Sequence, residues 1–304
     1  MGNVRSTQGL IGVLQSILRV SMSRIRKRLR SANGDRLFAG RYVLGEQLGQ
    51  GGTSRVFAAA IYDIHSDESD PIGECAIKVF NDTISRLPSA VQRVETQIRK
   101  LKNLSHPAFV EIRQCNMYQG AFFIEMERLE GITLAERLAS GERLPLGDAL
   151  HLFADLLTAL AVAHKAGVCH GDLKPSNIFL ANDGQVRILD FGITGVIGGA
   201  DDSGNLHTLI TPAYASPQRC HGEALSPDDD LYALACVIHE ALAGHHPYDR
   251  LSGLDAASKG MIPASLTIVP QPVSQMLTAC LAFERSSRPK EAGAARAPLL
   301  DVLP

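Results

Sequence analysis

The sequence of 304 residues lacks the features that mark several large classes of protein. It has no Cys-x-x-Cys pair, and its six cysteines are scattered, which fits reduced thiols in a cytoplasmic protein better than a disulfide framework or a zinc site. No apolar run reaches about 18 residues, so no transmembrane helix is expected. The formal net charge of −2 gives no overall argument for binding nucleic acid.

The charge is distributed unevenly, because the first 30 residues are strongly basic. Residues 8–30 carry apolar side chains at spacings of three and four, followed by a cluster of arginines, which predicts a basic amphipathic helix. Two interpretations stay open. The helix packs on the domain or forms a mobile leader, or it contacts a partner protein or an anionic membrane surface and makes the protein membrane-peripheral. Residues 1–40 are therefore predicted to be a leader and linker.

A polar loop between two apolar runs carries the most informative residues. Asp172, Lys174 and Asn177 lie close together there, and a proline and the asparagine disfavour helix. A carboxylate, an ammonium group and a carboxamide on one short span can accept a proton, hold a phosphate and ligate Mg²⁺, which suits phosphoryl transfer. Taken alone, the three residues also fit a polar surface loop, so the interpretation depends on the rest of the chain.

Residues 41–127 are predicted to form a small lobe of five strands and one helix. The first two strands flank a turn in which Gly49, Gly51 and Gly52 let the backbone approach a ligand and leave N–H groups for phosphate oxygens. Lys78 lies inside an apolar third strand, where it is costly unless it is paired or points outward from an edge. Further elements are predicted as a helix over 90–104 and strands over 109–112 and 121–126.

Residues 128–304 are predicted to form a hinge and a larger, mostly helical lobe. The segment 148–164 is amphipathic and ends near Gly167, which favours a left-handed helix cap. The segment 230–243 is apolar on nearly every side, which predicts a buried central helix. The long irregular stretch 190–218 is of a kind that is usually functional.

The glycine turn, the strand lysine, the helix, the loop of 170–177 and Asp190-Phe191-Gly192 follow one another in an order that resembles the protein kinases. They are most similar to the eukaryotic-like serine/threonine kinases of bacteria. The resemblance covers about residues 41–298 and implies an α+β, bilobal kinase fold. It also implies transfer of phosphate from ATP, with Mg²⁺, to serine or threonine hydroxyls of protein substrates.

The resemblance assigns roles by position. Asp172 would orient the acceptor hydroxyl and take its proton, Lys174 would stabilise charge on the γ-phosphate, and Thr211 would bridge these two side chains. Asn177 and Asp190 would hold Mg²⁺. The ATP site would comprise the phosphate-binding Gly49, Gly51, Gly52 and Lys78, the adenine-contacting Val56, Ala76 and Phe179, Met126 at the back of the pocket, and the hinge from Glu127 to Leu129.

Three supporting features also match the family. The segment from Thr211 to Gln218 resembles the one that cradles the residue after the target hydroxyl. Asp230 matches the aspartate that holds the backbone of the catalytic loop. Arg288 matches an arginine near the end of the fold.

Two departures from the family pattern lie before the catalytic loop. Ser54 replaces the third glycine of the turn, which is tolerable at a negative φ. The helix glutamate that pairs with the strand lysine is replaced by Gln97. We favour Gln97 over Glu95 for this position because an apolar residue, Leu101, lies one turn after Gln97.

Two further departures concern phosphorylation and a buried ion pair. Gly171 replaces the arginine that reads phosphate on the activation loop, which predicts activity independent of phosphorylation there. The candidate phosphorylation sites are Ser203, Thr208 and Thr211. Gln218 replaces the glutamate expected to pair with Arg288, which then needs another partner if it is buried.

The residues that would touch phosphate, metal and proton are all present, which favours an active enzyme. One alternative is a nucleotide-binding pseudokinase or scaffold, which would bind ATP without transferring its γ-phosphate. The other is a small-molecule kinase of the aminoglycoside type, which also uses a His-Gly-Asp loop. Such kinases generally lack Asp190-Phe191-Gly192 and the segment 211–218.

Overall fold

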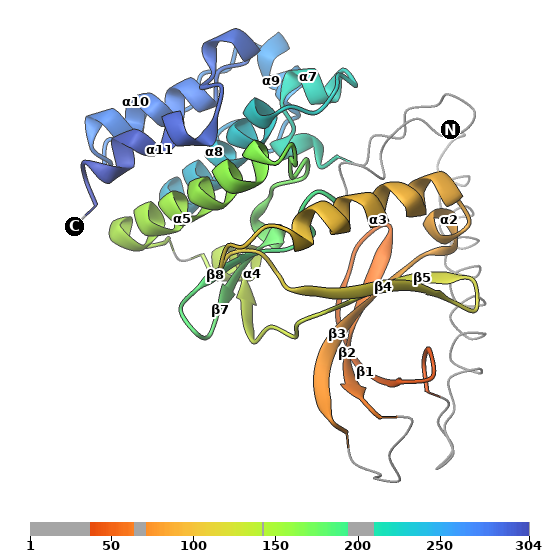
Figure 1. Ribbon diagram of the computed structural model, residues 1–304. Helices are drawn as coiled ribbons and strands as arrows, with labels where there is room; N and C mark the ends of the chain where they lie inside the picture. The colour runs from red at the N-terminus through yellow and green to blue at the C-terminus, as the bar shows by residue number, and fades with distance from the viewer. Residues whose placement is uncertain (1–36, 64–70, 142, 194–209, 304) are drawn as a thin grey trace, which may run out of the picture. The chain divides into compact units, whose positions relative to one another are not determined.

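The computed structural model describes residues 37–63, 71–141, 143–193 and 210–303 (Figure 1). The predicted leader helix and the candidate phosphorylation sites Ser203 and Thr208 lie outside the described residues. The chain forms two compact units. The first holds the described residues up to Asp82 together with Gln114–Arg128, and the second holds Thr83–Arg113 and the chain from Leu129 onward. The first is mainly strand and the second mainly helix, which confirms the predicted α+β class.

One antiparallel sheet, in the order β1-β2-β3-β5-β4, builds the first unit (Figure 1). Its strands are β1 (Tyr42–Gln50), β2 (Ser54–Ile61), β3 (Gly73–Phe80), β4 (Ile112–Tyr118) and β5 (Ala121–Met126). Alternate side chains of a strand point to opposite faces. One face therefore carries the apolar cluster of this unit, which includes Tyr42, Ile77 and Phe123.

The strand predicted over residues 109–112 is wrong. The strand of this region begins at Ile112, whereas Phe109 makes only an isolated bridge to Ile188 and packs its ring against Phe191. Phe109 and Ile112 instead pack against the core of the second unit. The true strand β4 has mostly half-buried and exposed positions, so its alternation is weak in the sequence.

The second unit contains helices and short strands around one core. Its elements, with α2 at the boundary, are α2 (Asp82–Ser85), α3 (Pro88–Lys102), β6 (Gly131–Thr133), α4 (Leu134–Ala139), α5 (Leu146–Lys165), η1 (Pro175–Asn177), β7 (Ile178–Ala181), β8 (Val186–Ile188), η2 (Pro212–Tyr214), α7 (Pro217–Cys220), α8 (Pro227–Ala243), α9 (Gly253–Ser258), α10 (Gln271–Cys280), η3 (Arg285–Ser287) and α11 (Ala292–Leu300). The helix α3, which the sequence assigns to the first lobe, groups with this unit.

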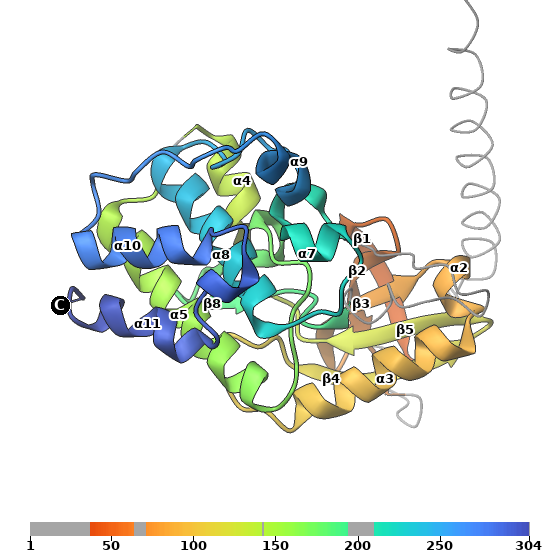
Figure 2. The same ribbon diagram turned by 90° about the horizontal axis from the view of Figure 1, so that it is seen from above.

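Helix α8 is the centre of this core, as predicted. Every residue from Asp228 to Leu242 is buried, and α5, α10 and α11 pack around this helix and one another (Figure 2). Its first turn has a capping box between Ser226 and Asp229, and Gly244 ends it with a φ of 79°. Gly167, with a φ of 69°, follows α5 and confirms the predicted left-handed residue.

Among the described helices, α5 alone has the length and mean hydropathy, 1.5, of a membrane-crossing helix. Burial explains this apolar character, because 56% of its most apolar window is buried inside the protein. Its leucines and alanines belong to the same core cluster as α8.

Candidate active site

The catalytic-loop residues predicted from the sequence come together around Asp172. Lys174 donates from Nζ to Asp172 Oδ2 at 2.7 Å and to Thr211 Oγ1 at 2.8 Å. Thr211 in turn donates from Oγ1 to Asp172 Oδ1 at 2.7 Å and from its backbone N–H at 3.1 Å. The predicted bridge by Thr211 between Asp172 and Lys174 is therefore present. The bridge fixes the Asp172 side chain, which is only 7% exposed, and the Lys174 side chain, which is 26% exposed.

Asn177 ties this loop to the residue that precedes Asp190. Its side-chain Nδ2 donates to the backbone oxygen of Asp172 at 2.8 Å, and its own carbonyl accepts from the N–H of Leu189 at 2.8 Å. The ring of His170 contacts the carbonyl oxygen of Leu189 at 2.9 Å. Two residues of the catalytic loop thus bracket Leu189 and position the next residue, Asp190, which has a φ of 57°.

The residues after Asp190 are anchored by packing. Phe191 is 5% exposed, and its ring meets those of Phe109 and His170 edge to face at 5.1 and 5.2 Å. Gly192 lies so close to Gln97 that a Cβ there would be 2.3 Å from Gln97 Nε2. Gln97 is buried, Glu95 is partly exposed, and Leu101 joins the core cluster of Phe191, so the helix register predicted for Gln97 is confirmed.

A single buried carboxylate holds the backbone of the catalytic loop. Asp230 accepts from the N–H of His170 and the N–H of Gly171, both at 2.8 Å, and from the ring of His164 at 2.8 Å. Gly171 has a φ of 82°, a conformation that side chains rarely adopt. The glycine that replaces the family's arginine therefore lets the backbone turn toward Asp230 at little steric cost.

Burial alone would raise the pKa of the Asp230 carboxyl. The hydrogen bond from His164, the charges of His164 and His170 and the N–H of Gly171 outweigh it and hold the pKa below its ordinary value. An ionised Asp230 only accepts hydrogen bonds, so His164 must donate from Nε2.

The ligand atoms of His164, Cys169 and Asp230 lie within 4.8 Å of one another, a grouping that could hold a metal ion. Both carboxylate oxygens of Asp230 already accept hydrogen bonds, and Cys169 is a protonated thiol. Burial, followed by the charges of the three aspartates at the start of α8, raises the pKa of Cys169 to about 12. The group therefore fits a clamp on the catalytic loop better than a metal centre.

Four of the predicted ATP-site residues of the first unit share one face of its sheet. Val56 lies opposite Lys78 across β2 and β3, and Met126 lies opposite Ala76 across β3 and β5. Paired residues, and residues two apart on one strand, have side chains on the same face. Lys78 is 4% exposed on an inner strand, with Nζ 5.6 Å from the centroid of the Phe80 ring, so the outward-pointing edge lysine is excluded.

The glycine turn is open, with one correction. No atom lies within 4 Å of a Cβ placed at Gly49, Gly51 or Gly52. However, the N–H of Gly51 donates to the carbonyl of Ser54 at 2.9 Å, so the prediction that the glycine N–H groups are left for phosphate does not hold for Gly51. Ser54 itself is absent from the described residues with positive φ, as its tolerance requires. The hinge residues Glu127 and Leu129, and Phe179 on β7, are half-buried.

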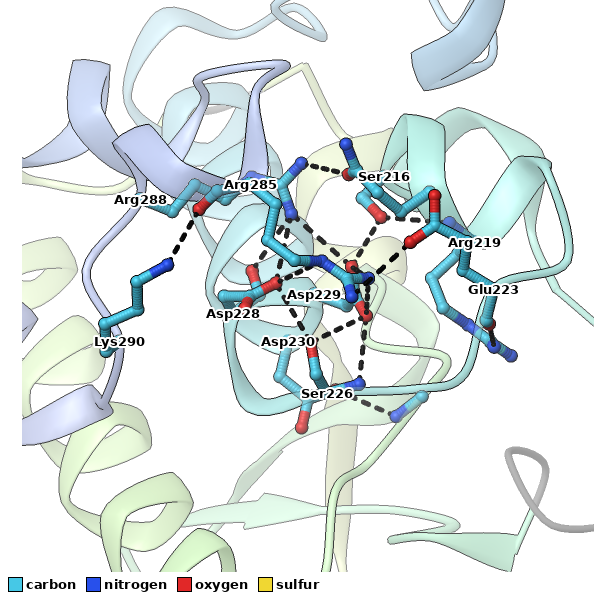
Figure 3. Close-up of polar contacts among 12 residues, drawn as sticks. Ser216, Arg219, Glu223, Ser226, Asp228, Asp229, Asp230, Arg285, Arg288 and Lys290 are labelled. Atoms are coloured by element: carbon cyan, nitrogen blue, oxygen red, sulfur yellow. Dashed lines mark hydrogen bonds and ion pairs between the residues drawn. The ribbon is translucent and has the colours of Figure 1, made fainter.

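The segment 211–218 is fastened to α8 by a buried polar network (Figure 3). Ser216 donates from Oγ to Asp229 Oδ1 at 2.6 Å. Arg288 donates from Nη2 to Gln218 Oε1 at 2.5 Å, and its Nη1 lies 3.4 Å from carboxylate oxygens of Asp228 and Asp229. The predicted need for a further partner of Arg288 is thus met by the first turn of α8.

Arg285 joins the same network, with ion pairs of 3.2 Å to Asp228 and 3.1 Å to Asp229 (Figure 3). These pairings were not predicted from the sequence. The run of three aspartates at 228–230 was the signal for them, because so many adjacent carboxylates in a buried helix require cationic partners.

Helix α9 approaches the segment 211–218 closely enough to require glycine. A Cβ at Gly253 would lie 2.5 Å from the carbonyl oxygen of Ala215 and 2.9 Å from the backbone nitrogen of Pro217.

We expect Gly253→Ala to lower the free energy of unfolding by about 1–3 kcal/mol in urea denaturation, because backbone atoms must move. Gly147→Ala is the control. Its Cβ meets open space in α5, so it should be neutral or stabilising by about 0.5–1 kcal/mol. Equal effects of the two substitutions would contradict the close approach.

The comparison with protein families decides which family this arrangement represents. The family described as "Protein kinase domain" matches residues 42–299. The chain belongs to the protein kinase family. The matched range includes the loop of 170–177, the Asp190-Phe191-Gly192 segment and the glycine turn, on which the resemblance rested.

Two curated relatives of the kinase come from bacteria. A probable serine/threonine-protein kinase of Streptomyces coelicolor is 32% identical over 222 residues, which are 70% of this chain and 32% of that protein. The serine/threonine-protein kinase PknB of Mycolicibacterium smegmatis is 32% identical over 217 residues, 68% of this chain and 33% of its own length. The chain thus spans about a third of the length of the curated relatives it matches.

Solved structures support the fold of the kinase. The crystal structure of the Mycobacterium tuberculosis PknI kinase domain matches with a TM-score of 0.65 at 22% identity, covering 87% of this chain and 96% of that one. At this identity the match bears on the fold alone.

Proposed function

We propose that the chain is an active serine/threonine protein kinase that transfers the γ-phosphate of ATP, with Mg²⁺, to hydroxyl groups of proteins. The observation that carries the proposal is the bonded set of Asp172, Lys174 and Thr211, held on a clamped loop. The names of the bacterial relatives support the serine/threonine branch. An intact set of this kind argues against a pseudokinase, in which these positions have no chemistry to serve.

The geometry supports a role for each of these side chains. Asp172 has two carboxylate oxygens oriented by Thr211 and Lys174, so an acceptor hydroxyl that reaches it finds a fixed proton acceptor. Lys174 carries a positive charge next to that carboxylate and can neutralise charge that develops on the transferred phosphoryl group. Positioning and charge neutralisation are what phosphoryl transfer requires of a protein.

The donor set fits Mg²⁺ and ATP. Asn177 uses its Nδ2 to bind the catalytic loop, which leaves the amide oxygen as a ligand atom, and Asp190 supplies a carboxylate from the residue after Leu189. Such oxygen ligands are those that Mg²⁺ prefers. When bound, Mg-ATP supplies the phosphoryl group to be transferred. In the first unit, Lys78 and the open glycine turn are the groups suited to its phosphates.

The test is a transfer assay with Mg-ATP and a panel of acidic and basic proteins, with phosphoserine and phosphothreonine as the readout. The Asp172→Ala chain is measured beside the natural one. Binding of ATP without transfer would select the pseudokinase. Transfer to an aminoglycoside but to no protein would select the small-molecule kinase.

We also expect activity that does not depend on phosphorylation of the activation loop. Gly171 has no side chain to pair with a phosphate, and its backbone is held by Asp230 instead. Thr211 already hydrogen-bonds Asp172 and Lys174 through its unmodified hydroxyl. Phosphatase-treated protein should therefore keep its kcat within about twofold of the untreated sample. A loss of activity on treatment, restored by autophosphorylation, would refute this expectation.

A further inference from the structure

An arginine outside the catalytic loop is bonded to the segment that would hold the acceptor. Arg250 lies in the connection between α8 and α9, and its Nη1 donates to the hydroxyl oxygen of Tyr214 at 3.2 Å. Its Nη2 pairs with Oε1 of Glu240 on α8. Tyr214 donates its own proton to the other oxygen of Glu240 at 2.6 Å. The three side chains form a closed ring of hydrogen bonds, and Tyr214 belongs to the segment 211–218.

The two charges of this ring differ sharply in exposure. The Glu240 side chain is 7% exposed, whereas that of Arg250 is 62% exposed. Both carboxylate oxygens of Glu240 are therefore occupied and covered, and the guanidinium group is the part that solvent or a peptide meets. A guanidinium group has five N–H donors, and this one uses two of them on Tyr214 and Glu240, so others remain for a ligand.

The backbone that presents Arg250 is held in an uncommon conformation. Asp249 and Arg250 have φ values of 51° and 60°, in the left-handed region that non-glycine residues rarely adopt. His246 stabilises it by accepting at Nδ1 from the N–H groups of Tyr248 and Arg250, both at 3.1 Å. Burial lowers the pKa of His246 to about 4, so its ring is neutral and able to accept at neutral pH. Conformations of this kind cluster at functional sites.

The same connection lies directly against the segment 211–218. Three residues after Arg250, Gly253 makes the close approach to Ala215 and Pro217. Of the carboxylates nearby, Asp255 is engaged by the hydroxyl of Ser252 at 2.6 Å at the start of α9, and Asp249 is exposed. Arg250 thus presents an exposed positive charge beside the segment 211–218, against which an acceptor peptide would lie.

We propose that Arg250 is a specificity-determining residue that makes the enzyme favour acceptor peptides with an acidic side chain near the target hydroxyl. This proposal rests on the proposed function. A carboxylate of the peptide can form paired hydrogen bonds with the open edge of the guanidinium group. A basic side chain at the same place is repelled by the positive charge of Arg250. It also gains no partner in Glu240, because both carboxylate oxygens of Glu240 already accept hydrogen bonds.

The test uses peptides that differ only by one Glu, Ala or Arg, placed in turn at each position around a single serine. The ratio of kcat/KM for the Glu and Arg peptides should favour Glu by about fivefold at one position or more. Arg250→Ala should reverse this ratio, because Glu240 becomes available to a basic side chain. Arg250→Ala combined with Glu240→Gln should remove both preferences.

Lys259→Ala is the matched control, since Lys259 is an exposed cation at the end of α9 that forms no ion pair with another described residue. It should leave the ratio unchanged. An unchanged ratio in Arg250→Ala, or a natural enzyme that prefers Arg at every position, would overturn the proposal. Fluorescence anisotropy of the same peptides on the Asp172→Ala chain should show the same order of affinities. This binding readout separates the selectivity of Arg250 from any failure of phosphoryl transfer.

Discussion

Replacement of Asp172 by alanine is expected to lower kcat by about 10²–10⁴-fold, the usual contribution of a positioned general base. Lys174 and Thr211 both donate to Asp172, so its loss removes the proposed proton acceptor and leaves both donors without this partner. The affinity for ATP should change much less, because the residues proposed to bind the adenine and the α- and β-phosphates lie in other elements. Single-turnover transfer and ATP titration separate the two effects.

The control for this substitution is Asp183→Ala. Asp183 is an aspartate of the same unit whose side chain is 53% exposed and pairs with Arg187 at 2.9 Å. An exposed ion pair contributes little, so its removal should change kcat by less than about twofold. If Asp172→Ala retained a tenth of the natural kcat or more, Asp172 would not be the proton acceptor.

Asp230→Ala is expected to have the largest combined effect on stability and turnover. Asp230 is 1% exposed and accepts from two backbone N–H groups and His164, so its removal leaves buried donors without an acceptor. Breaking such a buried charged group costs about 3–5 kcal/mol of folding free energy. The catalytic loop also loses its backbone clamp, and displacement of Asp172 by about 1 Å would lower kcat by roughly 10²-fold.

The pH dependence of stability gives a second readout for Asp230. Its pKa is held below the ordinary value of 3.8, so the unfolded state binds the proton more readily than the folded state. The stability that Asp230 contributes is therefore present above pH 3.8 and is lost as the pH falls through the lower folded value. The difference in unfolding free energy between the natural protein and Asp230→Asn should shrink on acidification below 3.8.

Asp148→Asn serves as the comparison, because Asp148 also lies in the first turn of a helix but is exposed. It should lower stability by less than about 1 kcal/mol, the usual size of a helix-dipole contribution. Similar losses for Asp148→Asn and Asp230→Ala would show that Asp230 acts as an ordinary helix-terminal charge rather than as the clamp of the loop.

The catalytic loop could be predicted because its chemistry is local in sequence. So few residues separate Asp172, Lys174 and Asn177 that a turn containing Pro175 keeps them close together in space. The central helix was equally visible, since only a buried helix is apolar on every side. The position of Gln97 followed from helical periodicity alone, because a residue and the one four places later share a face.

Contacts between residues distant in sequence could not be predicted in the same way. Nothing in the local pattern shows that Arg250 would bond Tyr214 and Glu240, since each of the three lies in a different element. The same holds for the carboxylates that replace the missing glutamate beside Arg288. The hydrogen bond from Gly51 to Ser54 was missed because glycine content indicates backbone freedom but not which N–H group the turn consumes.

The thiol of Cys169 has a consequence for chemical reactivity. It lies immediately before His170, and its pKa of about 12 leaves almost no thiolate at neutral pH. Peroxide and electrophilic inhibitors attack the thiolate, so the cysteine nearest to the catalytic loop offers them little to react with. Burial, together with the carboxylates at the start of α8, among them the Asp230 that holds the loop, thus also protects the Cys169 thiol from oxidation and alkylation.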